Sequence, residues 1–321
     1  MDKILINWSR GFLWFHLSKH LLEKWDEIIW VNRLSSLKTE QEISIDSHMK
    51  PVREQLLKNF AHYSSFGLPS WDKDGFYHLL QDTPIETFIH MAGNSNVRNF
   101  IEDPALKIGQ ELDLFITTID ACRQHWVKKF VYASSTFTNF ADDESYNILN
   151  PYTAANKAKE IVARSYDTYY GLQTIWLRLP GVYWPYSREN TIINIFLSKI
   201  MNNQPVDIYW DPDVKISLIE ADVVSHRLRT LLLSDEKASG IYCINPTHMV
   251  SINDIIRLIT QTTGKSISTN YYPMTNLYSV HPAMNIQNDR YKPIGLDTSN
   301  IEDSLIQTIQ RNLDTAKGIS I

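Results

Sequence analysis

The chain has 321 residues and a formal net charge of −5, so it is long enough to bury a large core in one or two α/β domains. Its basic residues are scattered, which disfavours nucleic acid as a partner, and no apolar run is long enough to cross a membrane. Two cysteines give no disulfide framework, and without a basic leader segment we expect a cytoplasmic protein.

Apolar segments typical of strands alternate with segments of helical spacing along the first half of the chain. We expect strands at 3–7, 28–31, 87–92, 129–133 and 173–179, and helices at 11–24, 51–60, 74–81, 105–125 and 151–170. Residues 33–70 are otherwise polar and irregular. Repeated strand and helix alternation with short connections predicts a parallel, doubly wound α/β sheet of Rossmann type.

Beyond Pro180 the order loosens, and several prolines occur. A helix near 191–202 and short strands near 206–209 and 241–244 are typical of a smaller second lobe. We therefore divide the chain into a Rossmann domain at 1–180, with strands returned from later segments, and a mainly separate lobe at 181–321.

The first strand runs into the first helix through a segment that resembles a glycine-rich phosphate loop. Nucleotide-binding α/β proteins place G-x-x-G-x-x-G at such a junction. Gly11 matches the middle glycine, but Trp8 and Trp14 occupy the outer positions. The first glycine permits close approach of the backbone to a pyrophosphate and the third permits close packing of helix on strand, so two indoles would block both.

Further motifs follow in a fixed order along the chain. They lie at 88–98, 101–104, 122–135, 150–157 and 177–185. Together with the opening they resemble the extended short-chain dehydrogenase/reductase family, the NAD-dependent epimerases and dehydratases of nucleotide sugars, and are nearest to its UDP-glucuronate 4-epimerase-like members. The resemblance implies an NAD(P)-binding first domain, a second lobe that binds a nucleotide sugar, and a homodimer.

The resemblance also makes the tryptophans systematic. Eight of them fall where family members typically carry glycine: Trp8, Trp14, Trp25, Trp30, Trp126, Trp176, Trp184 and Trp210. Trp71 lies in a segment of looser register. Because tryptophan replaces glycine badly at turns, we hypothesise that UGA codons, which encode glycine in some bacteria, have been translated as tryptophan. The alternative is a genuinely tryptophan-rich protein whose indoles fill a vacated groove.

The resemblance implies a catalytic serine or threonine, a tyrosine that acts as acid and base, and a lysine four residues after the tyrosine that lowers its pKa and holds the nicotinamide ribose. Ser135 and Tyr152 match the first two positions. Asn156 stands at the lysine position, and Lys157 is rotated off the shared helix face. Asn156 can hydrogen-bond a ribose hydroxyl but supplies no charge, which weakens the case for activity.

Cofactor and substrate residues are assigned by the same resemblance. The cofactor set is Trp8, Arg10, Gly11, Phe12, Leu13, Trp14, Asn32, Arg33, Ala92, Gly93 and Tyr152, and the substrate set is Ser135, Tyr183, Arg188, Lys215 and Arg290. Asn32 and Arg33 stand where NAD-binding proteins usually carry an acidic residue, so the cofactor is NAD or NADP with a slight preference for NADP. We expect no metal.

Other departures from the family pattern concern single residues. Lys215 replaces the arginine that binds the substrate phosphate, and Glu111 replaces an asparagine in the long helix. His16 and His90 are expected to be packed structural residues, and Cys122 is expected in the core of its helix.

The run 135–137 lacks the neighbouring carboxylates with which dehydratases of this family eliminate water. Our first hypothesis is therefore a nucleotide-sugar epimerase that transiently oxidises a sugar hydroxyl with tightly bound NAD(P). Two alternatives stay open: an NADP-dependent reductase of a nucleotide-linked keto sugar, and a catalytically impaired binding or regulatory protein.

Overall fold

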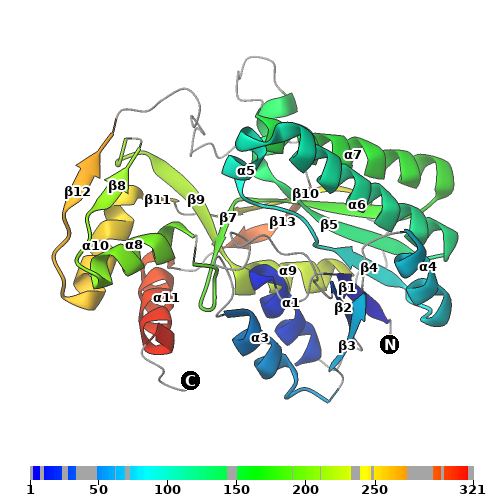
Figure 1. Cartoon of the computed structure of the whole chain (residues 1–321), viewed down its shortest axis with the longest axis horizontal. Helices are drawn as coiled ribbons and strands as arrows, with labels where there is room; N and C mark the ends of the chain where they lie inside the picture. The colour runs from blue at the N-terminus through cyan, green and yellow to red at the C-terminus, as the bar shows by residue number, and fades with distance from the viewer. Residues whose placement is uncertain are drawn as a thin grey trace.

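The computed structural model in Figure 1 describes most of the chain. The described residues are 3–7, 11–23, 28–33, 49–61, 63–68, 73–142, 150–189, 191–209, 211–232, 239–246, 249–272, 292–297 and 300–316. The predictions for Trp8, Arg10, Trp25, Trp71, Trp210 and Arg290 lie outside these residues. At 30–33 only the backbone is described, so the side chains of Trp30, Asn32 and Arg33 lie outside as well.

A large twisted sheet forms the main body of the molecule. Within the described residues it has eight strands in the order β13-β10-β6-β5-β4-β1-β2-β3, and all of its strand pairs are parallel. The strands are β1 (Ile4–Asn7), β2 (Ile28–Arg33), β3 (Tyr63–Leu68), β4 (Thr87–His90), β5 (Lys129–Ser135), β6 (Gln173–Leu179), β10 (Gly240–Pro246) and β13 (Lys292–Asp297). The strand order reverses at β1, so the predicted Rossmann-type sheet is confirmed.

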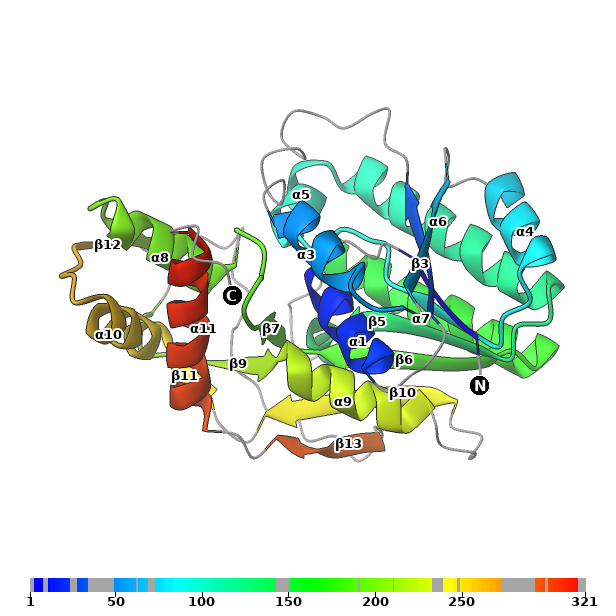
Figure 2. The ribbon, with the colours of Figure 1, turned by 90° about the horizontal axis from the view of Figure 1, so that it is seen from below.

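Helices cover both faces of this sheet, as Figures 1 and 2 show. One face carries α1 (Phe12–Leu22), α3 (Met49–Leu57) and α9 (Ala221–Leu232), and the other carries α4 (Lys73–Asp82), α6 (Pro104–Gln124) and α7 (Pro151–Tyr170). Two apolar cores result, because Ile4 and Ile6 face one side of β1 while Leu5 faces the other. Burial on both faces explains why the strands are continuous apolar runs.

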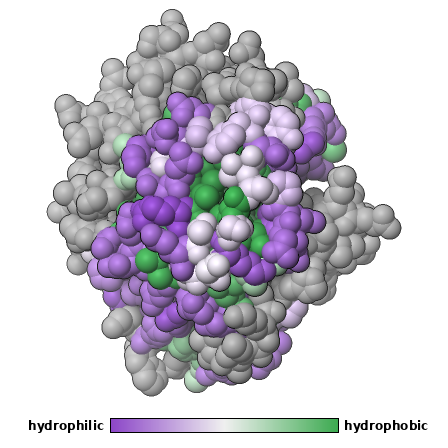
Figure 3. Space-filling model, turned by 90° about the vertical axis from the view of Figure 1, so that its left-hand side faces the viewer, coloured by the Kyte–Doolittle hydropathy of each residue, from purple (hydrophilic) through white to green (hydrophobic). Residues whose placement is uncertain are grey.

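The smaller lobe has its own core. Its elements are β7 (Gly181–Tyr183), α8 (Ile192–Met201), β8 (Val206–Ile208), β9 (Lys215–Glu220), β11 (Met249–Ser251), α10 (Ile252–Thr263), β12 (Thr269–Tyr271) and α11 (Ile301–Ala316). Phe196, Ile255 and Leu305 pack together at its centre. Its outer surface in Figure 3 is mostly hydrophilic around a small apolar area.

Two expectations about strands were wrong. Residues 33–70 contain, besides the expected helix, the strand β3, which pairs with β2 at the edge of the sheet. Ser64, Ser65 and Gly67 of this strand are exposed, so it lacks the apolar pattern that predicts strands. The strand expected in the second lobe near 241–244 is β10, which pairs with β6 in the main sheet. Which sheet a strand joins depends on tertiary packing.

Two short elements complete the description: α5 (Val97–Glu102) and the 3-10 turn η1 (Thr136–Asp142), which follow β4 and β5. Among the described helices, none has the length and apolar character needed to traverse a bilayer. The described residues also contain no group of three or more His, Cys, Asp or Glu side chains placed to hold a metal ion.

Candidate active site

The carboxyl ends of the strands define one edge of the sheet, where ligands of doubly wound proteins bind at the point of strand-order reversal. That point lies between β1 and β4, which pair in parallel. Asn7, His90 and Ser135 are the last residues of β1, β4 and β5. Because these strands are parallel neighbours, the three residues lie at the same edge of the sheet, and their side chains are buried.

Asn7 ties the end of β1 to the segment that follows β4. Its Oδ1 accepts hydrogen bonds from the backbone N–H groups of Met91 and Ala92 at 2.6 and 3.0 Å, and its Nδ2 donates to Nδ1 of His90 at 3.0 Å. Burial lowers the pKa of His90 to about 3, so the ring is neutral and can accept this bond. The contact fixes the backbone of Ala92, a predicted cofactor neighbour that Gly93 follows, although our sequence analysis missed Asn7.

The N-terminus of α1 lies just after β1. Gly11 has an extended conformation (φ −71°, ψ 152°) as its N-cap, and no side chain caps the helix there. A helix N-terminus at this position can bind a phosphate with its backbone N–H groups. Phe12, Leu13 and Trp14 are buried in the core between helix and sheet, so only their backbone is suited to the predicted cofactor contact.

His16 and Cys122 are packed residues, as expected. The Nε2 of His16 donates to the carbonyl of Pro185 at 2.9 Å, and burial lowers its pKa to about 3. Cys122 is fully buried in α6, and burial raises the pKa of its thiol. Neither side chain belongs to the candidate site.

Tyr152 lies in the first turn of α7, which Asn150 caps by accepting from the N–H of Thr153 at 2.9 Å. The side chains of Ser135 and Asn156 lie beside the side chain of Tyr152. Burial raises the pKa of Tyr152, and the two neighbouring polar side chains oppose that effect. The structure therefore brings the three predicted catalytic residues together.

A buried ion pair that the sequence analysis missed lies one turn further along α7. Lys159 is on the same helix face as Tyr152 and Asn156, at the i, i+4, i+7 spacing. Its Nζ lies 3.3 Å from Oε2 of Glu111 on α6, and the two residues are 6% and 8% exposed. The heptad spacing from Tyr152 was the available signal. Lys157 instead lies 3.8 Å from Glu160.

Arg188 is a predicted substrate residue whose charge acts on Tyr152. Its Nη2 donates to Oγ of Ser95 at 2.7 Å, which links the segment after β7 to the loop after β4. Its positive charge also lowers the pKa of Tyr152, as one of the smaller effects. Tyr183, by contrast, is 3% exposed, and its hydroxyl lies 2.6 Å from Oγ of Ser304. Tyr183 thus packs inside the small lobe, and its predicted contact with the substrate stays a prediction.

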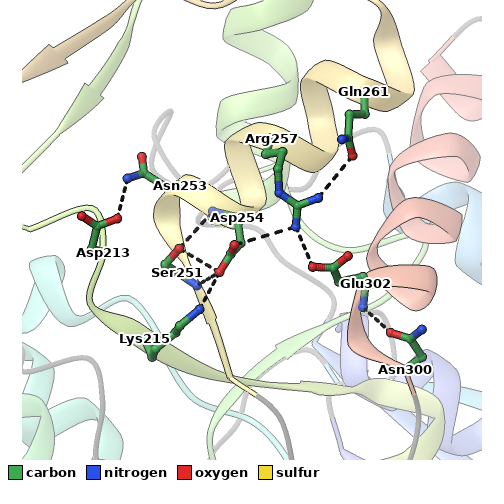
Figure 4. Close-up of polar contacts among 9 residues, drawn as sticks. All are labelled: Asp213, Lys215, Ser251, Asn253, Asp254, Arg257, Gln261, Asn300 and Glu302. Carbon is green, nitrogen blue, oxygen red and sulfur yellow. Dashed lines mark hydrogen bonds and ion pairs between the residues drawn. The ribbon is translucent and has the colours of Figure 1, made fainter.

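Lys215 begins β9 and is held by an acidic residue of α10, as Figure 4 shows. Its Nζ donates to Oδ2 of Asp254 at 2.8 Å. Asp254 also forms a capping box with Ser251, and the hydrogen bond from Lys215 is the main reason its pKa lies far below the usual range. Arg257 continues the network to Glu302 of α11 at 2.6 Å. Lys215 is thus engaged within the lobe while still half exposed.

The reversed parallel sheet, the N-terminus of α1 at its reversal point and the neighbouring Ser135 and Tyr152 define a Rossmann-type dinucleotide-binding protein. A sequence model described as the NAD dependent epimerase/dehydratase family matches residues 4–241. The chain belongs to this family.

Individual relatives agree with this assignment. The chain is 22% identical to a UDP-glucuronate 4-epimerase from Thermodesulfobacterium geofontis over 281 residues, or 84% of each protein. It is 28% identical to Protein CapI from Staphylococcus aureus over 220 residues, which cover 64% of this chain and 62% of that protein. A crystal structure of UDP-glucuronic acid 4-epimerase from Bacillus cereus, in complex with UDP-glucuronic acid and NAD, matches 98% of this chain and 99% of its own with a TM-score of 0.78 at 18% identity.

Proposed function

We propose that the protein is a nucleotide-sugar epimerase that transiently oxidises a sugar hydroxyl with tightly bound NAD(P). The observation that carries this proposal is that Tyr152 lies beside Ser135 and Asn156 at the carboxyl edge of the sheet. The names of the relatives, several of which are UDP-glucuronate 4-epimerases, support the same reaction class. No observation favours the reductase alternative.

The residues present fit a dinucleotide at this edge. Tyr152 and Asn156 offer hydrogen bonds to a ribose, and Gly11 with the N-terminus of α1 offers backbone N–H groups to a diphosphate. Asn32 and Arg33 are the last two residues of β2, at the same edge. A neutral residue next to a cation there supports the slight preference for NADP over NAD. When bound, the cofactor would take up a hydride and return it.

The chain itself supplies the proton transfer and the positioning. Tyr152 accepts the proton of the sugar hydroxyl, and Ser135 holds the oxygen from which it leaves. Asn156 is held beside Tyr152, since its Nδ2 donates to the backbone carbonyl of that residue at 3.0 Å. Because Asn156 is uncharged, we infer that turnover is slower than it would be with lysine at this position. Arg188, Lys215 and Arg290 remain our proposals for substrate contacts.

We also propose that the native protein has glycine at the positions where this sequence shows tryptophan and family members carry glycine. The strongest support is Trp126, which has φ +59° and is 88% exposed. Trp126 follows α6. The N–H of Val127 donates to the carbonyl of Cys122 at 3.0 Å, and the N–H of Trp126 donates to the carbonyl of Arg123 at 3.4 Å. These bonds form a Schellman motif, in which the left-handed residue is usually glycine.

Three other described helices are also followed by a left-handed residue, which is glycine or asparagine in each case. Gly171 and Gly264 both have φ +68° after α7 and α10, and Asn203 has φ +54° after α8. A bulky residue in this conformation is an outlier, and the exposed indole of Trp126 gains nothing from packing. Trp176 adds a second observation, since its Nε1 is buried without a hydrogen-bond partner in the described part of the chain.

The recoding proposal is tested by the gene and by the native protein. UGA codons at positions 8, 14 and 126, with glycine in peptide mass spectra of protein from the source cell, would support it. UGG codons at these positions, or tryptophan in the native peptides, would refute it.

The epimerase proposal is tested with full-length protein carrying glycine at the recoded positions. Bound NAD(P) in the purified protein, and formation of the 4-epimer from UDP-glucuronate or another UDP-sugar without net change of cofactor, would support it. Net consumption of NADPH with a keto sugar would identify the reductase instead. Protein that binds UDP-sugar but retains no cofactor would identify a binding or regulatory protein.

We further propose that the protein is a cytoplasmic homodimer that pairs through α6 and α7. These adjacent helices expose apolar side chains, with Leu106, Ile116 and Ile161 between 43% and 54% exposed. Exposed apolar residues on a pair of packed helices are suited to association with a second pair.

A further inference from the structure

The ion pair between Glu111 and Lys159 lies buried between α6 and α7, outside the group of Ser135, Tyr152 and Asn156. Both residues are more than nine-tenths buried. Removing two charges from water is costly, and such a pair often stabilises a fold no better than apolar residues of similar size would. Its presence next to the candidate site therefore calls for a role other than packing.

The two carboxylate oxygens of Glu111 bind different partners. Oε2 lies 3.3 Å from Nζ of Lys159, and Oε1 accepts a short hydrogen bond from the backbone N–H of Asn94. The backbone at Gly93 packs directly on this carboxylate, because a Cβ at Gly93 would lie 2.7 Å from Oε2. Glu111 thus holds the loop after β4, and Lys159 holds Glu111.

The same loop leads across to the small lobe. Ser95, the residue after Asn94, accepts the hydrogen bond from Arg188 at 2.7 Å. The charges of Glu111 and Arg188 act in opposite directions on Tyr152: the first raises its pKa and the second lowers it. The position of the loop 93–95 and the charge next to Tyr152 therefore both depend on the connected residues Glu111, Ser95 and Arg188.

We propose that Lys159 and Glu111 form a positioning pair. The pair fixes the loop 93–95 against α6 and α7, and it sets the net charge near the Tyr152 hydroxyl, to which the uncharged Asn156 contributes nothing. Lys159 acts through Glu111, since it neutralises a carboxylate that would otherwise repel a phenolate. The inference rests on the proposed function in one respect, namely that Tyr152 transfers the proton.

The charged groups that act on the pKa of Tyr152 are Glu111 of α6 and Arg188 of the segment after β7. Lys159 of α7 acts through Glu111, with which it is paired. Removing the carboxylate leaves the two cations, which favour the phenolate. Removing Lys159 leaves the carboxylate uncompensated, which disfavours it.

The first experiment follows the titration of Tyr152 by NMR of isotope-labelled tyrosine, with Tyr152→Phe to assign the signal. We expect Glu111→Gln to shift the titration midpoint of Tyr152 to lower pH and Lys159→Met to shift it to higher pH. The control is Lys199→Met, which breaks a similar pair with Asp207 in the small lobe and should leave the midpoint unchanged. If Glu111→Gln and Lys159→Met both leave it unchanged, the electrostatic role is overturned.

The second experiment tests the loop by amide hydrogen exchange at Asn94. The double variant Glu111→Leu with Lys159→Met removes both charges together, so it leaves no unpaired buried ion and should fold. It also removes the hydrogen-bond acceptor, and we expect exchange at Asn94 to become roughly tenfold faster. Glu111→Gln keeps an acceptor oxygen and should retain slow exchange. Equal exchange in the double variant and the unmodified protein would overturn the positioning role.

Both readouts are independent of turnover. If the shifts occur but no UDP-sugar is epimerised, the proposed function fails and the positioning pair stands. If a UDP-sugar is epimerised but neither readout changes, the positioning pair fails and the proposed function stands. If both hold, the pH profile of turnover should move with the Tyr152 midpoint in each variant.

Discussion

Tyr152 is the residue on which the proposed chemistry depends. It is partly buried, faces Ser135, and has an aromatic neighbour in Phe100, whose ring centroid lies 5.3 Å away. We expect Tyr152→Phe to lower the turnover of a UDP-sugar by at least about 100-fold, because proton transfer by a positioned group contributes that much or more. Steady-state kinetics measures the loss. Tyr169→Phe is the matched control on the same helix, where the side chain is 83% exposed, and an equal loss there would contradict the assignment.

His16 is a second single residue with a testable effect, because it makes the free energy of unfolding depend on pH. Burial lowers its pKa to about 3, whereas the unfolded chain binds a proton near pH 6.5. The stability that this neutral histidine contributes is therefore fully present above about pH 6.5 and is lost as the pH falls toward the folded-state value. Denaturant unfolding between pH 7 and pH 4 should show a shallower decrease for His16→Gln. His78→Gln, at an exposed position on α4, should keep the original slope.

At the scale of elements, the end of α6 shows what a helix terminus requires. A residue in the left-handed conformation after the helix lets backbone N–H groups bond to the free carbonyls of the last turn. Any residue with a Cβ costs free energy in that conformation. We expect Trp126→Gly to raise the free energy of unfolding by about 1 kcal/mol, measured by urea denaturation. Asn203→Gly, at the corresponding position after α8, should change it by only a few tenths because asparagine tolerates this conformation. A destabilised Trp126→Gly variant would count against the recoding proposal.

At the scale of the whole molecule, two helices together form one exposed surface. α6 and α7 pack side by side over one face of the sheet and carry Ile116 and Ile161 on their exposed sides. If these helices pair between two copies, Ile116→Glu combined with Ile161→Glu should convert a dimer to a monomer, because buried carboxylates without partners are costly. Sedimentation equilibrium measures the change. Ile306→Glu, at an exposed position on α11, should leave the assembly intact.

The amino-acid sequence alone determined the class of fold and the centre of the site. Its apolar periods define strands and helices locally, and Ser135, Tyr152 and Asn156 lie in continuous motifs whose spacing is preserved on folding. Helical rotation also excluded Lys157 from the face of Tyr152 without any tertiary information.

Only the tertiary structure decided which distant side chains meet. Glu111 and Lys159 are 48 residues apart, and Asn7 contacts Met91 and Ala92 from more than 80 residues away, so no local pattern joins them. The same holds for Tyr183, which the packing of the small lobe turns toward Ser304. A periodic pattern shows which face of an element is apolar, whereas the partner of a polar group depends on how the elements pack together.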